Sequence, residues 1–281
     1  MEKGLIIKNI SDTYYVLVNN EVIECIPRGK MRSNKQIPLV GDFVFIDKFN
    51  KTIEEILPRK NEILRPKVAN ITKGIIVTSL KHPEFSTNLL DKLLVELEIN
   101  HIKPIILLTK KDLLTSKEFN DIKPIIDYYI SIGYKVLYNT ELNKIKKELE
   151  DNISVFMGQT GAGKSTLLNK LFNDLNLKTG EISLALGRGK HTTRHVEIII
   201  KDKIKVLDTP GFSALSFISF SKEMVRDAFI EFKNYPCIYK DCYHLKESEC
   251  NVKKAVIDNK ILKSRLDNYQ QFISEFDNIR R

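Results

Sequence analysis

The sequence predicts a multidomain protein with an amino-terminal β-barrel, a central α/β domain built around a largely parallel sheet, and a mostly helical carboxyl-terminal domain. Three observations predict this organisation. Short β-type runs fill the first part of the chain, strands alternate with helix-length segments from about residue 71, and three of the four cysteines lie between Cys237 and Cys250. We place the domain boundaries at residues 1–67, 68–225 and 226–281.

The chain has 281 residues, a formal net charge of +9 and 42% hydrophobic residues. This excess of positively charged side chains favours a polyanionic partner. A surface that is generally rich in lysine is the alternative interpretation. No apolar stretch approaches the roughly 18 residues that a membrane span needs, and residues 1–10 lack the apolar segment of a signal peptide. With so few cysteines, we expect a cytoplasmic protein that has no membrane partner.

The amino-terminal barrel is predicted from five short β-type runs. They lie at residues 5–10, 14–18, 22–26, 42–47 and 52–57. Strands at this spacing are typical of a small barrel, and the OB-fold is the leading candidate. The loop at residues 28–35 contains four cations and no acidic residue, which makes it the best local candidate for RNA phosphates; a merely solvated loop is the alternative. The four cations are Arg28, Lys30, Arg32 and Lys35.

The central domain alternates strands and helices, which indicates βαβ units. The predicted strands lie at residues 74–80, 104–108, 135–138, 153–157, 196–200 and 204–207. The predicted helices lie at residues 87–100, 116–132, 141–150 and 164–173. Residues 174–194 lack both patterns and are expected to form a loop. Further along, one apolar stripe predicts a helix packed on a core, and it consists of Leu262, Leu266, Tyr269, Ile273 and Phe276.

The strongest motif follows the predicted strand at residues 153–157. It is Gly158-Gln159-Thr160-Gly161-Ala162-Gly163-Lys164-Ser165-Thr166, which matches the phosphate-binding P-loop. Backbone N–H groups of such a loop, together with the positive end of the next helix, surround phosphates. Lys164 is expected to reach the β- and γ-phosphates as a catalytic group, and the Ser165 hydroxyl to bind Mg²⁺. A glycine-rich turn without a ligand is the alternative.

A second motif ends the predicted strand at residues 204–207. Asp208-Thr-Pro-Gly211 has the form of the DxxG element of GTPases. Asp208 is expected to hold Mg²⁺ through water, and Gly211 to offer its N–H to the γ-phosphate; a simple turn is the alternative. Between this motif and the P-loop, residues 187–194 include two threonines where a switch loop must close on the metal. Thr193, rather than Thr192, is the expected second magnesium ligand.

The choice of base is predicted by Thr109-Lys110-Lys111-Asp112, which matches the N/T-K-x-D guanine motif at the end of a strand. The Asp112 carboxylate suits the two adjacent N–H donors of guanine, which adenine lacks, and the Lys110 stem is expected to cover the ring. A helix-capping Asp is the alternative. Asn139 and Thr140 follow the next strand, where GTPases place their last base-contacting loop.

The order of these motifs is unusual, because the guanine motif precedes the P-loop. Cutting an ordinary GTPase after its DxxG region and joining its old termini gives this order, with the helix at residues 141–150 forming the join. Nearby termini make such a permutation physically accessible. The sequence therefore predicts a circularly permuted P-loop GTPase that uses GTP with Mg²⁺.

The carboxyl-terminal domain contains a group of soft metal ligands. Cys237, Cys242, His244 and Cys250 offer three thiolates and an imidazole, a set suited to tetrahedral Zn²⁺. Buried structural cysteines or a disulfide between Cys237 and Cys250 are the alternatives. We expect one structural zinc ion per chain. Cys25 stands alone in an apolar strand and is predicted to be a core residue.

Together, the motifs TKKD, GQTGAGKST, GRGKHTTR, DTPGF and CxxxxCxHxxxxxC resemble those of the RsgA family, also called YjeQ or YloQ, of small-subunit ribosome assembly GTPases. The resemblance covers nearly the whole chain. It implies an OB-fold, a permuted GTPase domain and a zinc domain, with GTP hydrolysis stimulated by the small ribosomal subunit during late maturation. The sequence departs from the family at Thr109, where Asn is more usual, and at Asn139-Thr140, where Ser-Ala is typical.

The group that activates water is a separate question. Many GTPases place Gln directly after DxxG, whereas this chain has Phe212, which cannot orient water by hydrogen bonding. His191 is the nearest titratable candidate, and the family resemblance points to it as well. A contact of His191 with rRNA or solvent is the alternative. We expect a monomeric GTPase that acts on the small subunit and its rRNA; a nucleotide-switched rRNA chaperone without significant turnover is the competing function.

Overall fold

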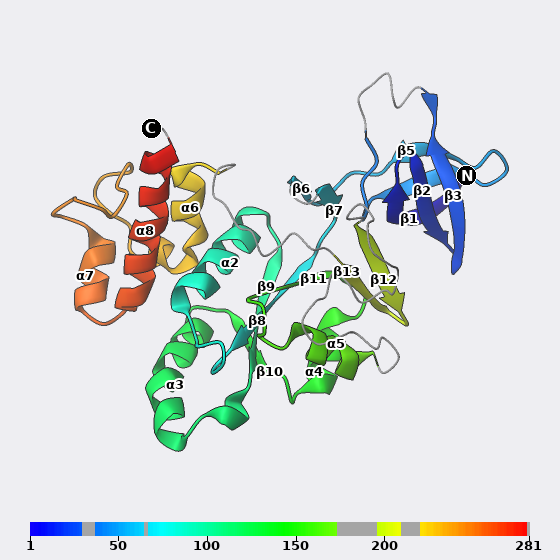
Figure 1. Cartoon of the computed structure of the whole chain (residues 1–281). Coiled ribbons are helices and arrows are strands. Elements are labelled where there is room, and N and C mark those ends of the chain that lie inside the picture. Colours follow the sequence, from blue (N-terminus) through cyan, green and yellow to red (C-terminus); the bar gives the residue numbers. More distant parts are fainter. Residues whose placement is uncertain (30–36, 65–66, 173–195, 209–219, 280–281) are drawn as a thin grey trace. The chain divides into compact units, whose positions relative to one another are not determined.

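The structure is a computed structural model that describes residues 1–29, 37–64, 67–172, 196–208 and 220–279 (Figure 1). The chain divides into two compact units. Unit 1 consists of Met1–Ile75, Thr140–Phe156 and Gly163–Ser213. Unit 2 consists of Ile76–Asn139, Met157–Ala162 and Ala214–Arg281. The expected loop at residues 174–194 lies wholly outside the described residues.

The amino-terminal part of unit 1 is a closed five-stranded barrel. Its strands are β1 (Glu2–Ile10), β2 (Thr13–Val18), β3 (Glu21–Pro27), β4 (Phe43–Asp47) and β5 (Thr52–Ile56). They run in the order β1-β2-β3-β5-β4, and β4 returns to pair antiparallel with β1. Alternate residues of each strand point inward because successive side chains of a strand face opposite sides. Val16, Val44 and Ile53 are fully buried in this way, and Cys25 is a core residue as predicted.

A buried carboxylate explains why the fourth strand starts one residue later than predicted. Asp42 lies before β4 and is fully buried, and its carboxylate accepts the Leu39 N–H at 2.7 Å. The guanidinium of Arg59 donates to both Asp42 oxygens at 2.8 Å, which is the bidentate geometry that stabilises a buried carboxylate.

Next to Arg59 are two strands that the sequence did not predict. They are β6 (Glu62–Leu64) and β7 (Lys67–Ala69), which form an antiparallel pair.

The rest of unit 1 continues the sheet beyond the barrel. It contains α4 (Leu142–Leu149), β11 (Ile153–Met157), α5 (Lys164–Leu171), β12 (Glu197–Lys201) and β13 (Ile204–Asp208). The order continues as β11-β13-β12-β1, with β11 and β13 parallel and the other pairs antiparallel. Lys8 of β1 faces Glu197 of β12, and their charged groups lie 2.8 Å apart.

Unit 2 contains the second half of β8 (Lys73–Ser79), the strands β9 (Lys103–Thr109) and β10 (Lys135–Tyr138), and most of the helices. These strands run in the order β10-β9-β8, and β9 and β10 are parallel. The first helices are α2 (Thr87–Ile99) and α3 (Ser116–Ser131). α3 begins at a capping box, in which Thr115 and Glu118 exchange side-chain to backbone hydrogen bonds. The later elements are α6 (Lys222–Ala228), η3 (Ile230–Asn234), α7 (Asn251–Ile257) and α8 (Lys263–Ile279).

The apolar stripe predicted for the last helix is confirmed as core at three of its five members, whereas Leu262, which precedes α8, and Phe276 are half-buried. Leu266, Tyr269 and Ile273 of α8 are buried against the residues of α6 and η3, among them Phe229 and Phe232. Phe272 is also fully buried, which widens the stripe beyond its predicted members. Among the described helices, none is both long enough and apolar enough to cross a membrane.

Arg265 forms a buried ion network that the sequence analysis did not find. Its side chain is 0% exposed, and it donates to both oxygens of Glu231 at 2.7 and 2.8 Å and to Asp91 of α2 at 2.7 Å. The Tyr129 hydroxyl and the Asn268 amide also donate to the Asp91 carboxylate. Each buried charge is therefore hydrogen-bonded, which is the condition for tolerating charge in a core. The network joins α2 and α3 to η3 and α8 within unit 2.

Candidate nucleotide and metal sites

The P-loop begins where β11 ends, and its first glycine is required by a close backbone approach. Gly158 has φ +130°, and a Cβ at this position would lie 2.1 Å from the Val77 carbonyl oxygen. Gly161 and Gly163 also have positive φ, of +80° and +98°. These backbone conformations favour glycine, and they turn the chain sharply between strand and helix. The order strand, glycine loop, helix is the context that the motif needs.

The second half of the loop forms the start of α5. Gly163 is the N-cap residue, and its carbonyl accepts the Leu167 N–H at 2.9 Å. Lys164 and Ser165 are the first residues of the helix, and Ser165 is buried. Burial lowers the pKa of Lys164. Phosphates beside this lysine would favour its charged form again, which is the electrostatic setting expected of a phosphate site.

The guanine motif contacts the P-loop through a buried hydrogen bond. Thr109, the last residue of β9, donates its hydroxyl to the Ala162 carbonyl at 2.7 Å. The structure thus brings together two motifs that lie 53 positions apart in the sequence. This contact gives Thr109 a physical role at the position where the resemblance leads one to expect Asn.

The remaining guanine-motif residues form an exposed turn. Lys110 has φ +59°, and residues Lys111–Leu113 form the short helix η1, which contains Asp112. The Lys110 ammonium donates to the His82 carbonyl of the loop that follows β8, a partner that sequence reasoning missed. Asn139 lies beside this region because its N–H donates to Leu108 O at 3.0 Å, and Thr140 follows as an exposed residue. The base contacts of these residues stay predictions.

Several predicted nucleotide ligands lie where no side chain is described. Asp208 ends β13, but only its backbone is described. Thr193, His191 and Gly211 lie outside the described residues. Their assigned roles stay predictions.

The loop predicted to bind RNA phosphates is described only at its start. Lys30, Arg32 and Lys35 lie outside the described residues. The Arg28 side chain is 64% exposed, and its guanidinium lies 2.5 Å from the carboxylate of Glu54 on β5. Arg28 is therefore paired within the barrel, and a phosphate would have to compete with Glu54 for it.

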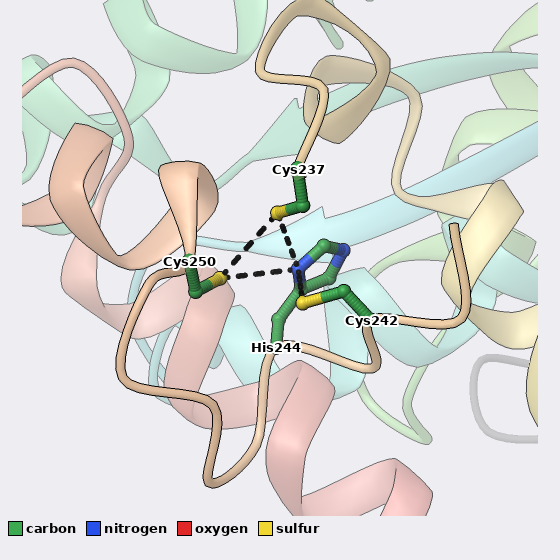
Figure 2. A group of neighbouring side chains, drawn as sticks. All are labelled: Cys237, Cys242, His244 and Cys250. Carbon is green, nitrogen blue, oxygen red and sulfur yellow. Dashed lines mark hydrogen bonds between the residues drawn. The ribbon is translucent and has the colours of Figure 1, made fainter. Parts of the chain in front are cut away.

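The four predicted zinc ligands converge at one point in unit 2 (Figure 2). All four ligand atoms lie within 4.8 Å of one another. The Cys237 and Cys250 sulfurs are 3.8 Å apart and unbonded, which excludes the disulfide in this structure. His244 Nδ1 lies 3.6, 3.4 and 3.2 Å from the sulfurs of Cys237, Cys242 and Cys250.

These separations match those of a tetrahedral zinc site. With Zn–S bonds of about 2.3 Å and Zn–N bonds of about 2.0 Å, the ligand atoms of a tetrahedron lie about 3.8 Å apart for two sulfurs and about 3.5 Å for sulfur and nitrogen. Burial and the neighbouring thiols raise the pKa of Cys242 to about 12, so three thiolates this close need a cation to be ionised together. Burial lowers the pKa of His244, which favours the neutral imidazole that metals bind.

Helix α8 supports the backbone of the zinc site. The Tyr269 hydroxyl donates to the Tyr243 carbonyl at 2.7 Å, and the Gln270 amide donates to the His244 carbonyl at 2.9 Å. The rings of Phe232 and Tyr269 pack against the imidazole, with centroids 5.4 and 5.9 Å away. The apolar stripe predicted the position of Tyr269, but no sequence signal indicated these contacts. Zinc at this site would close the segment from Cys237 to Cys250 on itself, while the hydrogen bonds from α8 hold that segment in place.

Two family models match the chain in succession. The RsgA N-terminal domain matches residues 3–53, and the RsgA GTPase matches residues 56–218. The small ribosomal subunit biogenesis GTPase RsgA of Enterococcus faecalis is 45% identical over 99% of this chain and 96% of its own length. The protein of the same name from Clostridium botulinum is 42% identical over 99% of both chains.

Solved structures give the same result. YjeQ from Thermotoga maritima has a TM-score of 0.85 and 32% identity, covering 98% of each chain. YloQ, described as a circularly permuted GTPase, has a TM-score of 0.84 and 37% identity, covering 99% of this chain and 96% of its own. The barrel, the permuted GTPase domain and the helical region with its Cys3His cluster are thus confirmed as the fold. Since the two family models match most of the chain and relatives this similar span nearly all of it, the chain belongs to the RsgA GTPase family.

Proposed function

We propose that this GTPase binds the small ribosomal subunit in the cytoplasm and hydrolyses GTP during late maturation of the subunit. The observation that best supports the proposal is the hydrogen bond from Thr109 to Ala162, because it joins a guanine motif to a P-loop in permuted order. The names of the relatives connect such proteins to biogenesis of the small subunit. The barrel then serves as the rRNA contact, with the chain acting as a monomer.

We assign the nucleotide contacts as follows. The backbone of residues 158–163 surrounds the phosphates, Lys164 neutralises their charge, and Gly211 donates to the γ-phosphate. Asp112 accepts from the guanine edge, Lys110 covers the base, and Asn139 and Thr140 border it. Ser165, Asp208 and Thr193 would hold Mg²⁺, which supplies charge neutralisation at the phosphates. The domain boundaries at residues 67/68 and 225/226 belong to the same proposal.

We predict that Asp112→Asn weakens GTP binding by about 10- to 100-fold, because one of the two donors on the base then faces an NH₂ donor in place of a carboxylate oxygen, and the negative charge is lost. The same substitution should strengthen binding of xanthosine triphosphate, since the base then carries an oxygen where guanine has its amino group, and the Asn amide can donate to it. Isothermal titration with both nucleotides measures the change. Asp121→Asn, at an exposed carboxylate of α3, is the matched control. Parental GTP affinity in Asp112→Asn would show that the base pocket lies elsewhere.

We predict that His191→Ala keeps GTP affinity within about twofold but lowers turnover stimulated by the small subunit by about 100-fold or more. The physical reason is the loss of the polar group that orients water, which Phe212 cannot replace. GTP turnover is measured with and without purified subunits. His101→Asn is the control, because His101 is exposed and its φ of +55° is tolerated by Asn.

Two turnover measurements, one on the parent protein with and without small subunits and one on His191→Ala, separate the competing functions. Unchanged stimulation in His191→Ala would exclude this residue and leave the ribosome as the donor of the missing group. If small subunits do not stimulate the parent protein at all, a nucleotide-switched rRNA chaperone becomes the better interpretation.

A further inference from the structure

We propose that Lys111 is a positioning residue for guanine recognition. The ammonium of Lys111 lies against the rings of Phe119 and Tyr138, and this contact fixes the turn that carries Asp112. The proposal rests on the assignment of residues 109–112 as the guanine motif and deepens it. It assigns a role to the variable position of the motif and brings in two aromatic residues from outside it.

Apart from the hydrogen bond that the Lys110 ammonium donates to the His82 carbonyl, the turn that carries Asp112 has little else to anchor it. None of the residues of η1 is buried. Its backbone hydrogen bonds are local, from Leu113 N to Lys110 O at 3.2 Å and from Leu114 N to Lys111 O at 3.1 Å. Such bonds shape the turn but do not hold it against the sheet. A carboxylate that must meet two donors at once needs a fixed position, because hydrogen bonds weaken steeply with poor angles.

Lys111 supplies a link from this turn to two other elements. Its ammonium lies 4.1 Å from the ring centroid of Phe119 and 4.9 Å from that of Tyr138. Both distances are well inside the range at which a cation is attracted by the face of an aromatic ring. Phe119 lies in the first turn of α3, whereas Tyr138 is the last residue of β10. One side chain of the motif is thus held by two elements at once.

Both rings sit on backbone that is itself well fixed. Tyr138 pairs with Leu108 of β9, so the ends of the two parallel strands are in register. Phe119 follows the capping-box residue Glu118, whose carboxylate also accepts from Lys81 at 2.8 and 3.0 Å. The positions of the two rings are therefore fixed, and the contact of Lys111 with them restricts the movement of the adjacent Asp112. Tyr138 also precedes Asn139, so the same contact ties the guanine motif to the last base-contacting loop.

The test compares binding of GDP and inosine diphosphate, which lacks the 2-amino group that Asp112 is assigned to bind. Lys111→Met keeps most of the length of the side chain but removes its charge. We expect it to weaken GDP binding about fivefold, as the loss of two exposed cation–π contacts implies, and to weaken inosine diphosphate binding clearly less. Lys111→Arg should restore the parental GDP preference, because guanidinium also stacks on rings. Tyr138→Leu combined with Phe119→Leu should reproduce the effect of Lys111→Met.

Two controls make the outcome decisive. Lys117→Met removes an exposed charge on α3 and should leave both affinities unchanged. Asp112→Asn must lower the preference for GDP over inosine diphosphate; if it does not, the guanine assignment fails and the inference fails with it. If Asp112→Asn lowers the preference while Lys111→Met leaves it at the parental value, or weakens both nucleotides equally, Lys111 has no positioning role and only the inference is overturned.

Discussion

Removal of zinc is expected to unfold residues 235–250, because in this segment the metal site replaces secondary structure. The segment lies between η3 and α7 and contains no helix or strand. Its buried residues are mainly the ligands themselves, Cys242, His244 and Cys250. Binding of a structural zinc ion contributes an apparent free energy of about 10–16 kcal/mol to folding. The few remaining contacts of the loop are too weak to offset the loss of this free energy.

The expected result is checked by metal analysis and by amide hydrogen exchange. Protein purified without added zinc should contain about one ion per chain. A strong chelator, or Cys242→Ser, should abolish protection of the amides that follow Cys237 and reduce it in α7 and α8. Cys25→Ala is the matched control, since this buried cysteine lies in the barrel and should not change the zinc content. A metal-free chain with full protection in this segment would contradict the prediction.

Arg265→Met is expected to lower the free energy of unfolding of unit 2 by about 3–5 kcal/mol, because it leaves two buried carboxylates without their cation. Asp91 and Glu231 would then lie in the core with no counter-charge from the arginine that now donates three hydrogen bonds to them. The guanidinium also lies 4.4 Å from the ring of Phe229, so packing is lost as well.

Urea unfolding followed by far-ultraviolet circular dichroism measures the effect, and the absence of tryptophan makes tyrosine the intrinsic fluorophore. Arg265→Lys should fall between the parent and Arg265→Met, because lysine keeps the charge but not the planar fork. Lys263→Met is the control on the same helix, since its side chain is 82% exposed and its ion pair with Asp267 lies at the surface. Its effect should stay below about 0.5 kcal/mol. An unfolding midpoint of Arg265→Met equal to that of Lys263→Met would refute the assigned role.

The elements of the fold were largely predictable because they leave local patterns. Alternation of apolar residues located the barrel strands, and the strands at residues 135–138 and 153–157 have the predicted limits. The strands β6 and β7 were missed because three residues are too few to show a period. Arg265 was missed for a different reason. Its partners lie 34 and 174 positions away, and a single-sequence pattern does not reveal that a cation inside a helix faces two distant acids.

The candidate sites were also predictable only in part: their motifs could be found in the sequence, but the residues that support them could not. Motif spacing identified the P-loop, the guanine motif and the four zinc ligands, since each is defined by residue types at short distances along the chain. The supports of these sites come from elsewhere: Tyr269 and Gln270 for the zinc loop, and Phe119 and Tyr138 for the guanine turn. A helical or β-type pattern predicts in which element such a residue lies, but not which residues it contacts. Their contribution depends on which elements pack together, so only the folded structure identifies it.

The buried ion network also has a consequence for how the chain is made. Asp91 and Arg265 are 174 positions apart. At about 5–20 residues per second, translation produces Asp91 roughly 9–35 s before the arginine that neutralises it. During this interval the nascent helix α2 cannot bury Asp91 beside its cation, because burial of a carboxylate without a partner is costly. Synthesis of α8 is therefore needed for the final compaction of unit 2, and a nascent chain that stalls before residue 265 is expected to leave Asp91 and the side of α2 that packs on α8 accessible to proteases and chaperones.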